Sequence, residues 1–126
     1  MNVALPAPLV HVVDDDDAVR AALVLLIEAQ GWQVRGFTSV AAWLEREDRA
    51  LPQCLVLDVE LDEPDGALLQ ECLHADPQVP PVVVLTSVPR GQPARRARGA
   101  GARCVLTKPQ GVDRLVGEIG RALPPP

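Results

Sequence analysis

The sequence predicts an α/β fold in which one doubly wound parallel sheet of five strands is covered by helices on both faces. Short apolar runs alternate along the chain with segments whose apolar residues recur at helical spacing. The apolar runs are continuous, which is typical of strands buried on both faces, whereas half-exposed strands alternate apolar and polar residues. Five such β–α units fit within one domain of 126 residues.

Each strand candidate is followed by a helix candidate. The strands are expected at residues 9–13, 32–37, 54–57, 81–86 and 103–107. The helices are expected at residues 17–29, after Ser39 with Trp43 and Leu44 buried, at 66–74, at 92–99, and in a closing segment that buries Leu115, Val116, Ile119 and Leu123. We expect the helix at 92–99 to be short or mobile, because its only apolar residues are alanines, which bury little surface.

Composition excludes several classes of protein. The net charge of −5 argues against nonspecific binding of nucleic acid. Three cysteines without a CxxC spacing indicate neither a disulfide framework nor a zinc site. No apolar stretch approaches the roughly 18–20 residues of a membrane span, and the N-terminus lacks a signal pattern, so we expect a cytoplasmic protein. Residues 1–123 are expected to form the domain, and the prolines at 124–126 to begin a linker or tail.

Polar residues stand where the strands are expected to end. Asp14 and Asp15 follow the first strand, Asp58 follows the third, Thr86 ends the fourth and Lys108 follows the fifth. In doubly wound sheets, ligands bind outside the carboxyl ends of the strands. Three carboxylates there would repel one another unless a cation offset them, and Mg²⁺ suits hard oxygen ligands. An ammonium and a hydroxyl complete a clamp for a phosphoryl group, which makes Asp58 the natural nucleophile.

Four motifs in order carry a family resemblance: VVDDDDAVR, CLVLDVELDEPDG, VVVLTS and GARCVLTKP. Together they resemble the receiver domain of bacterial response regulators, over residues 8–123. The opening and the third strand are most similar to the FixJ-type branch, whose members often carry a DNA-binding domain after the receiver. The resemblance implies a flavodoxin-like sheet with strand order 2-1-3-4-5 and five helices.

The resemblance also implies a site and a partner. Asp58 corresponds to the phosphoacceptor, which takes its phosphoryl group from a sensor histidine kinase. Such a domain catalyses only its own phosphorylation and dephosphorylation, and it signals by changed protein contacts. The implied Mg²⁺ ligands are Asp14, Asp15, Asp58 and the backbone carbonyl of Glu60, and the implied contacts to the phosphoryl group are Thr86 and Lys108.

The sequence departs from the family pattern in two places. The family's switch position, usually Tyr or Phe, holds Val105, and the chain has no Tyr. The loop 60–65 carries four acidic residues, an unusually negative approach for a phosphodonor. Both departures leave open an atypical receiver that serves as a protein-interaction module with weak or no phosphorylation. A phosphatase of the haloacid-dehalogenase type is disfavoured, because the motif Asp58-Val59-Glu60 lacks its second aspartate.

Three further expectations concern residues outside the expected ligand set. In the run of four aspartates, Asp16 is expected to face water and Asp17 to cap the following helix. His11 lies within a strand and is expected to be a packing or edge residue. The arginines of the segment 90–103 suggest either a basic face for an acidic partner or homodimer mate, or a solvated helix.

Overall fold

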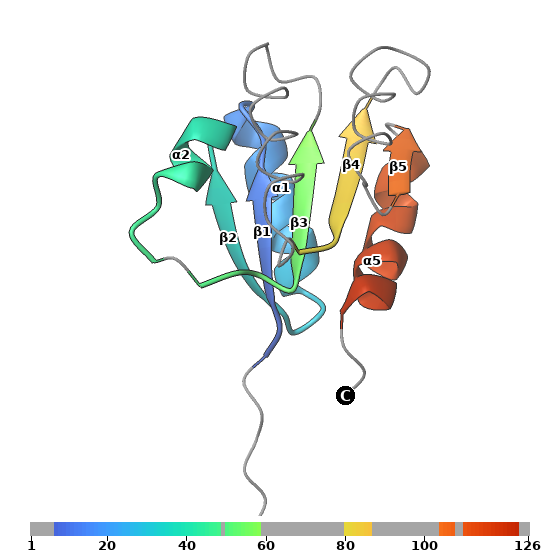
Figure 1. Ribbon diagram of the computed structural model, residues 1–126. Helices are drawn as coiled ribbons and strands as arrows, with labels where there is room; N and C mark the ends of the chain where they lie inside the picture. Colours follow the sequence, from blue (N-terminus) through green and yellow to red (C-terminus); the bar gives the residue numbers. More distant parts are fainter. Residues whose placement is uncertain (1–6, 49, 59–79, 87–103, 108–109, 124–126) are drawn as a thin grey trace, which may run out of the picture.

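The computed structural model describes residues 7–48, 50–58, 80–86, 104–107 and 110–123. Its centre is a parallel sheet with the strand order β2-β1-β3-β4-β5 (Figure 1). The strands are β1 (Leu9–Val13), β2 (Gln33–Phe37), β3 (Cys54–Asp58), β4 (Val82–Thr86) and β5 (Cys104–Thr107). The parallel doubly wound sheet expected from the continuous apolar runs is confirmed.

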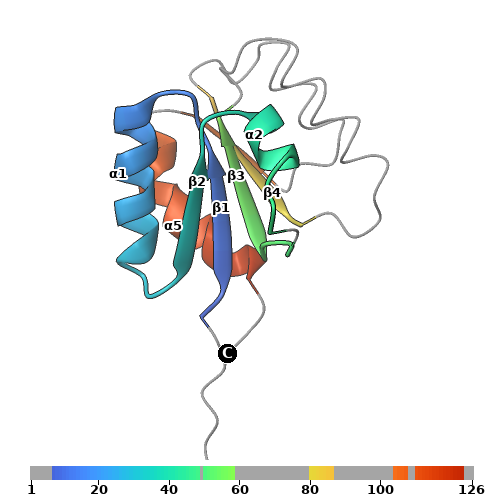
Figure 2. The ribbon, with the colours of Figure 1, turned by 90° about the vertical axis from the view of Figure 1, so that its left-hand side faces the viewer.

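Three helices fall within the described residues: α1 (Asp17–Glu28), α2 (Val40–Leu44) and α5 (Gln110–Ala122). Figure 2 shows α1 and α5 on one face of the sheet and α2 on the other. The helices expected at 66–74 and 92–99 lie outside the described residues. Ser39 caps α2 as expected, because its side chain accepts a hydrogen bond from the Ala42 backbone N–H at 3.0 Å.

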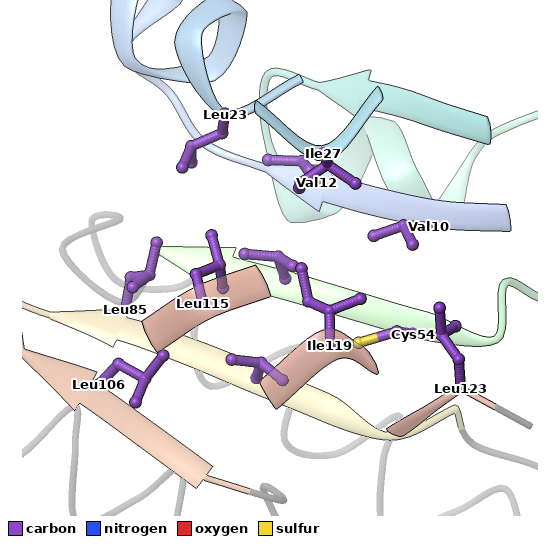
Figure 3. Close-up of a cluster of buried hydrophobic side chains, with 12 residues drawn as sticks. Val10, Val12, Leu23, Ile27, Cys54, Leu85, Leu106, Leu115, Ile119 and Leu123 are labelled. Carbon is purple, nitrogen blue, oxygen red and sulfur yellow. The ribbon is translucent and has the colours of Figure 1, made fainter. Parts of the chain in front are cut away.

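Alternate residues of β1, β3 and β4 enter two separate cores, which explains why these strands read as continuous apolar runs. The core under α1 and α5 contains Val10 and Val12 from β1 packed with Ile27 and Ile119 from the helices (Figure 3). The core under α2 contains Val13 from the same strand, together with residues of β2, β3 and β4. These three central strands therefore contribute apolar surface to both faces of the sheet.

The chain leaves α1 through a turn that requires glycine. Gly31 has a φ of 88°, in the left-handed region of backbone conformation that residues other than glycine rarely adopt. Its N–H donates to the Glu28 carbonyl at 2.9 Å, which closes the end of the helix. Trp32 follows the turn, and its indole lies 3.8 Å from where a Cβ on Gly120 of α5 would stand. The strand begins one residue later than expected, because its pairing with β1 starts at Gln33, opposite Leu9.

Candidate functional site

The strand register brings the polar strand ends to one edge of the sheet, at the arrowheads in Figure 1. In the β1–β3 pair, the last matched residues directly precede Asp14 on one strand and Asp58 on the other. In the β3–β4 pair, Asp58 lies opposite the residue before Thr86. Thr86 in turn pairs with Thr107 at the end of β5. The backbone thus places four consecutive strand ends side by side.

Asp14 is the buried member of the acidic run, with 0% of its surface exposed. Its backbone N–H donates to the Phe37 carbonyl at 3.1 Å, which extends the pairing with β2 beyond the strand. Its Oδ1 accepts a hydrogen bond from the Asp16 backbone N–H at 2.9 Å. Asp15, by contrast, is exposed. Two neighbouring carboxylates at this edge therefore differ in solvation, one held inside and one open to solvent.

Asp16 faces water as expected, but the capping role expected for Asp17 is wrong by one residue. Asp16 is the N-cap of α1, because its Oδ1 accepts from two backbone N–H groups of the first turn, at 2.9 and 3.1 Å. Asp17 is the first residue of the helix. The reason is the tight turn closed by Asp14, which holds Asp16 in extended backbone (φ −86°, ψ 114°) and lets the helix begin at once. A cap of this kind satisfies N–H groups that have no partner within the helix.

Arg20 links this turn to the helix and to the neighbouring strand. Its Nη1 donates to the Asp14 carbonyl oxygen at 2.8 Å, and its Nη2 donates to Oδ1 of Asp17. Its aliphatic stem lies against Gly36 of β2, where a Cβ would come within 3.1 Å of the arginine Cδ. Sequence reasoning missed this residue. The available signal was an arginine one helical turn after an aspartate run.

The remaining site residues are described only in part. Asp58 and Thr86 have defined backbone positions as the last residues of β3 and β4. Glu60 and Lys108 lie outside the described residues. Among the described side chains, no group of three or more His, Cys, Asp or Glu residues could hold a metal ion. The side chains of Asp58 and Glu60 are not among those described, so the expected set of metal ligands stays a prediction.

The carboxylates that are described fit a hard cation such as Mg²⁺. Asp14 is held in place by hydrogen bonds, while Asp15 stands exposed at the same edge. Mg²⁺ binds through one or two carboxylates and keeps several waters, and the exposure of Asp15 is compatible with a hydrated cation. When bound, such a cation would neutralise charge on a transferring phosphoryl group.

A second buried polar group lies on the opposite face of the sheet from α1. His11 is 2% exposed, and its Nδ1 accepts a hydrogen bond from Nε1–H of Trp43 at 2.9 Å. Its ring meets Phe37 edge-on, with the centroids 5.1 Å apart. Burial, together with the nearby charges of Arg46 and Arg35, lowers the pKa of His11 to about 4, against a small opposing effect of an aspartate. The expectation of a packing residue is confirmed, and its partner on α2 was not anticipated.

The fold and the site together define a class of protein. A doubly wound parallel sheet with carboxylates at its carboxyl edge is the arrangement of α/β domains that bind metal and phosphate at that edge. Within the described residues, no helix is both long and apolar enough to cross a membrane.

A family model for the response regulator receiver domain matches residues 10–120. The chain therefore belongs to the receiver domains of response regulators, the signalling proteins of two-component systems. This agrees with the resemblance carried by the four motifs.

Known response regulators are similar along most of the chain. The response regulator protein TodT of Pseudomonas putida is 32% identical over 117 residues, covering 93% of this chain and 52% of TodT. The transcriptional regulatory protein FixJ of Azorhizobium caulinodans is 38% identical over 100 residues, covering 79% of this chain and 47% of FixJ. This chain thus spans about half the length of these curated relatives.

Solved structures agree with the fold. Full-length FixJ from B. japonicum superposes with a TM-score of 0.78 at 30% identity, covering 94% of this chain and 58% of that one. A Francisella receiver domain superposes with a TM-score of 0.79 at 22% identity, covering 91% of this chain and 95% of that one. The second likeness bears on the fold alone.

Proposed function

We propose that this receiver domain accepts a phosphoryl group on Asp58, from the phosphohistidine of a sensor histidine kinase and with the help of Mg²⁺. A carboxylate oxygen of Asp58 attacks the phosphorus, the P–N bond to the donor histidine breaks, and an aspartyl phosphate forms. Hydrolysis of that phosphate returns the domain to its starting state. The signal leaves the domain as changed protein contacts.

One observation carries the proposal. In a chain of the receiver family, the acidic pair follows β1 and Asp58 ends the neighbouring strand β3, at the same edge of the sheet. Asp14 and Asp15 would hold the cation together with Asp58 and the backbone carbonyl of Glu60. Phosphoryl transfer depends mainly on positioning and on neutralising charge, so a fixed edge of this kind suits it.

The rest of the site is proposed from sequence position. Lys108 would place an ammonium against the phosphoryl oxygens, and Thr86 would donate its hydroxyl to them. Thr86 is the last residue of β4, which pairs with β3, and Lys108 follows β5, which pairs with β4, and these positions support their place at this edge. The same proposal includes helices at 66–74 and 92–99, which would complete the five-helix complement of the fold.

The partners of the whole protein are also proposals. The relatives named transcriptional regulatory proteins extend well beyond the region matched here. We therefore propose that a DNA-binding output domain follows the prolines at 124–126 in the natural protein, which would act in the cytoplasm. Formation of a homodimer on phosphorylation would be the change in protein contacts that transmits the signal from the receiver domain to the output domain.

Asp58 phosphorylation can be tested on this chain alone. Wild-type protein with Mg²⁺ and acetyl phosphate should gain one phosphoryl group by intact mass spectrometry, and the Asp58→Asn variant should gain none. Asp48→Asn is the control, because Asp48 is exposed in the loop between α2 and β3 and should leave phosphorylation unchanged. No phosphoryl gain by wild type, or an equal gain by Asp58→Asn, would contradict the proposal.

Two departures from the family pattern favour a second candidate function, a protein-interaction module with weak or no phosphorylation. Val105 stands where the family has its switch aromatic, and four acidic residues occupy the loop 60–65. Size-exclusion chromatography before and after phosphorylation separates the two candidates. Tight Mg²⁺ binding with an unchanged oligomeric state after treatment with acetyl phosphate would favour the interaction module.

A further inference from the structure

We propose that Arg20 is a positioning residue for the acidic edge. It holds the turn between β1 and α1 in the conformation in which Asp14 and Asp15 meet a divalent cation. The inference rests on the proposed function and goes beyond it, because Arg20 lies outside the expected ligand set and would act on the cation only through the turn.

The contacts of the guanidinium join both ends of the turn. At one end, Nη1 donates to the Asp14 carbonyl oxygen at 2.8 Å, at the point where the chain leaves β1. At the other end, Nη2 donates to Asp17, the first residue of α1. Asp15 lies between these two anchors and is itself exposed. A hydrogen bond from a charged donor to the Asp14 carbonyl therefore fixes the peptide that leads directly into Asp15.

The aliphatic part of the Arg20 side chain is also packed against the protein, unlike that of a fully exposed arginine. Its side chain is 18% exposed, against 86% for Asp17. Gly36 of β2 supplies the space, because an added Cβ there would stand 3.1 Å from Arg20 Cδ and 3.2 Å from its Cγ. The stem of Arg20 thus lies against β2 at Gly36, and the guanidinium reaches the turn from there. Groups that orient metal ligands from outside the ligand set commonly alter metal affinity by about 10–100-fold.

A simple charge effect would act in the opposite direction. Arg20 carries a positive charge beside four aspartates, and a positive charge near the site repels a divalent cation. If charge alone mattered, removing the arginine would strengthen Mg²⁺ binding. If positioning dominates, removing it weakens binding. The sign of the change therefore separates the two roles.

The decisive variants are Arg20→Gln and Arg20→Lys. The glutamine removes the positive charge and the guanidinium, whose two terminal nitrogens donate to Asp14 and Asp17, whereas the lysine keeps the charge but has a single donor nitrogen. Isothermal titration calorimetry with MgCl₂ on the purified chain measures the affinity directly, without phosphorylation. We expect the affinity to fall in the order wild type, Arg20→Lys, Arg20→Gln, with the glutamine variant weaker by about tenfold, the lower end of the range for such positioning groups. Equal affinities, or a glutamine variant that binds more tightly than wild type, would overturn the positioning role.

Arg121→Gln is the matched control for loss of an exposed ion pair. Arg121 pairs with Glu118 three residues earlier on α5, as Arg20 pairs with Asp17 on α1. Its removal should leave Mg²⁺ affinity unchanged. Circular dichroism of each variant without Mg²⁺ establishes that the protein is folded at the titration temperature.

Gly36→Ala provides an independent test, because it touches no acidic residue. The added methyl group must displace the Arg20 stem by a few tenths of an ångström. Mg²⁺ binding should weaken, by less than in Arg20→Gln. If Arg20→Gln does not fold, an unchanged affinity in Gly36→Ala and Arg20→Lys together overturns the proposal. If the wild-type chain binds no Mg²⁺, both the proposed function and the positioning role are contradicted. If the wild-type chain binds Mg²⁺ but the affinities of the variants do not follow the expected order, only the positioning role is contradicted.

Discussion

Protonation of His11 should make the stability of this domain depend on pH between about 6.5 and 4. The imidazole is 2% exposed, and its Nδ1 accepts the indole N–H of Trp43 at 2.9 Å. A proton on Nδ1 would break that hydrogen bond and place a charge between Arg46 and Arg35 in a buried site. The neutral form is therefore the one that the fold stabilises.

The sign and size of the effect follow from the two pKa values of His11. Folding lowers this pKa from 6.5 to about 4, so the unfolded chain binds more protons between these values. The free energy of unfolding is unaffected by His11 above pH 6.5, falls as the pH drops through the window, and reaches its full loss below pH 4. At pH 5 the loss amounts to about 2 kcal/mol, and the full loss to about 3 kcal/mol, at 1.36 kcal/mol per unit.

Urea unfolding followed by circular dichroism at pH 7.5, 6 and 5 measures this dependence. The comparison is with His11→Asn, whose amide oxygen can still accept from the Trp43 N–H but does not titrate in this range. Carboxylates titrate alike in both proteins, so the difference between them isolates His11. We expect wild type to lose about 2 kcal/mol more than the variant between pH 7.5 and 5.

A parallel loss of stability in wild type and His11→Asn would refute this reasoning. Trp43→Phe offers a second comparison, because it removes the donor while keeping an aromatic ring under the sheet. Without that donor the neutral imidazole loses a partner, and the pH dependence should become smaller than in wild type. An undiminished dependence in Trp43→Phe would show that burial and the two arginines suffice without the hydrogen bond.

Two further predictions concern α1. Asp16→Ala should lower the free energy of unfolding by about 1 kcal/mol, because it removes the cap of the helix, while Asp17→Ala should cost much less, since its ion pair is exposed. Ile27→Ala should cost about 2–5 kcal/mol, because Ile27 is fully buried in the core under α1. Leu25→Ala on the same helix, with Leu25 68% exposed, should change stability by less than about 0.5 kcal/mol. Urea unfolding at pH 7.5 measures all four, and equal losses within either pair would contradict the described burial or cap.

The central strands β1, β3 and β4 were predictable because burial on both faces leaves a strong apolar pattern in the sequence. All five expected runs match strands to within one residue at each end. The helix after Ser39 was likewise predictable, because a serine before an apolar stretch supplies the hydroxyl that the first turn needs. These are local signals, carried by neighbours in the sequence.

The division of the aspartate run was not predictable to the residue. Four identical side chains give no compositional reason to place the cap at Asp16 rather than at Asp17. The choice is made by Asp14, which turns inward where β1 ends and accepts the Asp16 N–H. The acidic pair itself could be located from sequence because it follows the strand, whereas its inner and outer members are decided by the turn.

The partner of His11 was unpredictable for a different reason. His11 and Trp43 are separated by 32 residues, and their contact exists only because α2 covers the face of the sheet to which His11 contributes. Apolar periodicity shows that a residue is buried, but it does not show which polar group it meets. The same limit applies to Arg20 and Gly36, which meet across α1 and β2.

The two polar features lie on opposite faces of the sheet and should therefore respond to different conditions. Arg20 joins the acidic turn to α1, and the core under α1 consists of apolar side chains together with Cys54. His11 joins β1 to α2 through a hydrogen bond that a proton would break. Mild acid should weaken the α2 face while the α1 face that anchors the acidic turn keeps its packing. The link between them is β1 itself, whose alternate residues serve both cores and which ends directly at Asp14. A loss of Mg²⁺ affinity in mildly acidic solution could be transmitted from His11 through β1, or it could arise at the carboxylates themselves. His11→Asn distinguishes the two routes, because it removes the imidazole and leaves the carboxylates unchanged.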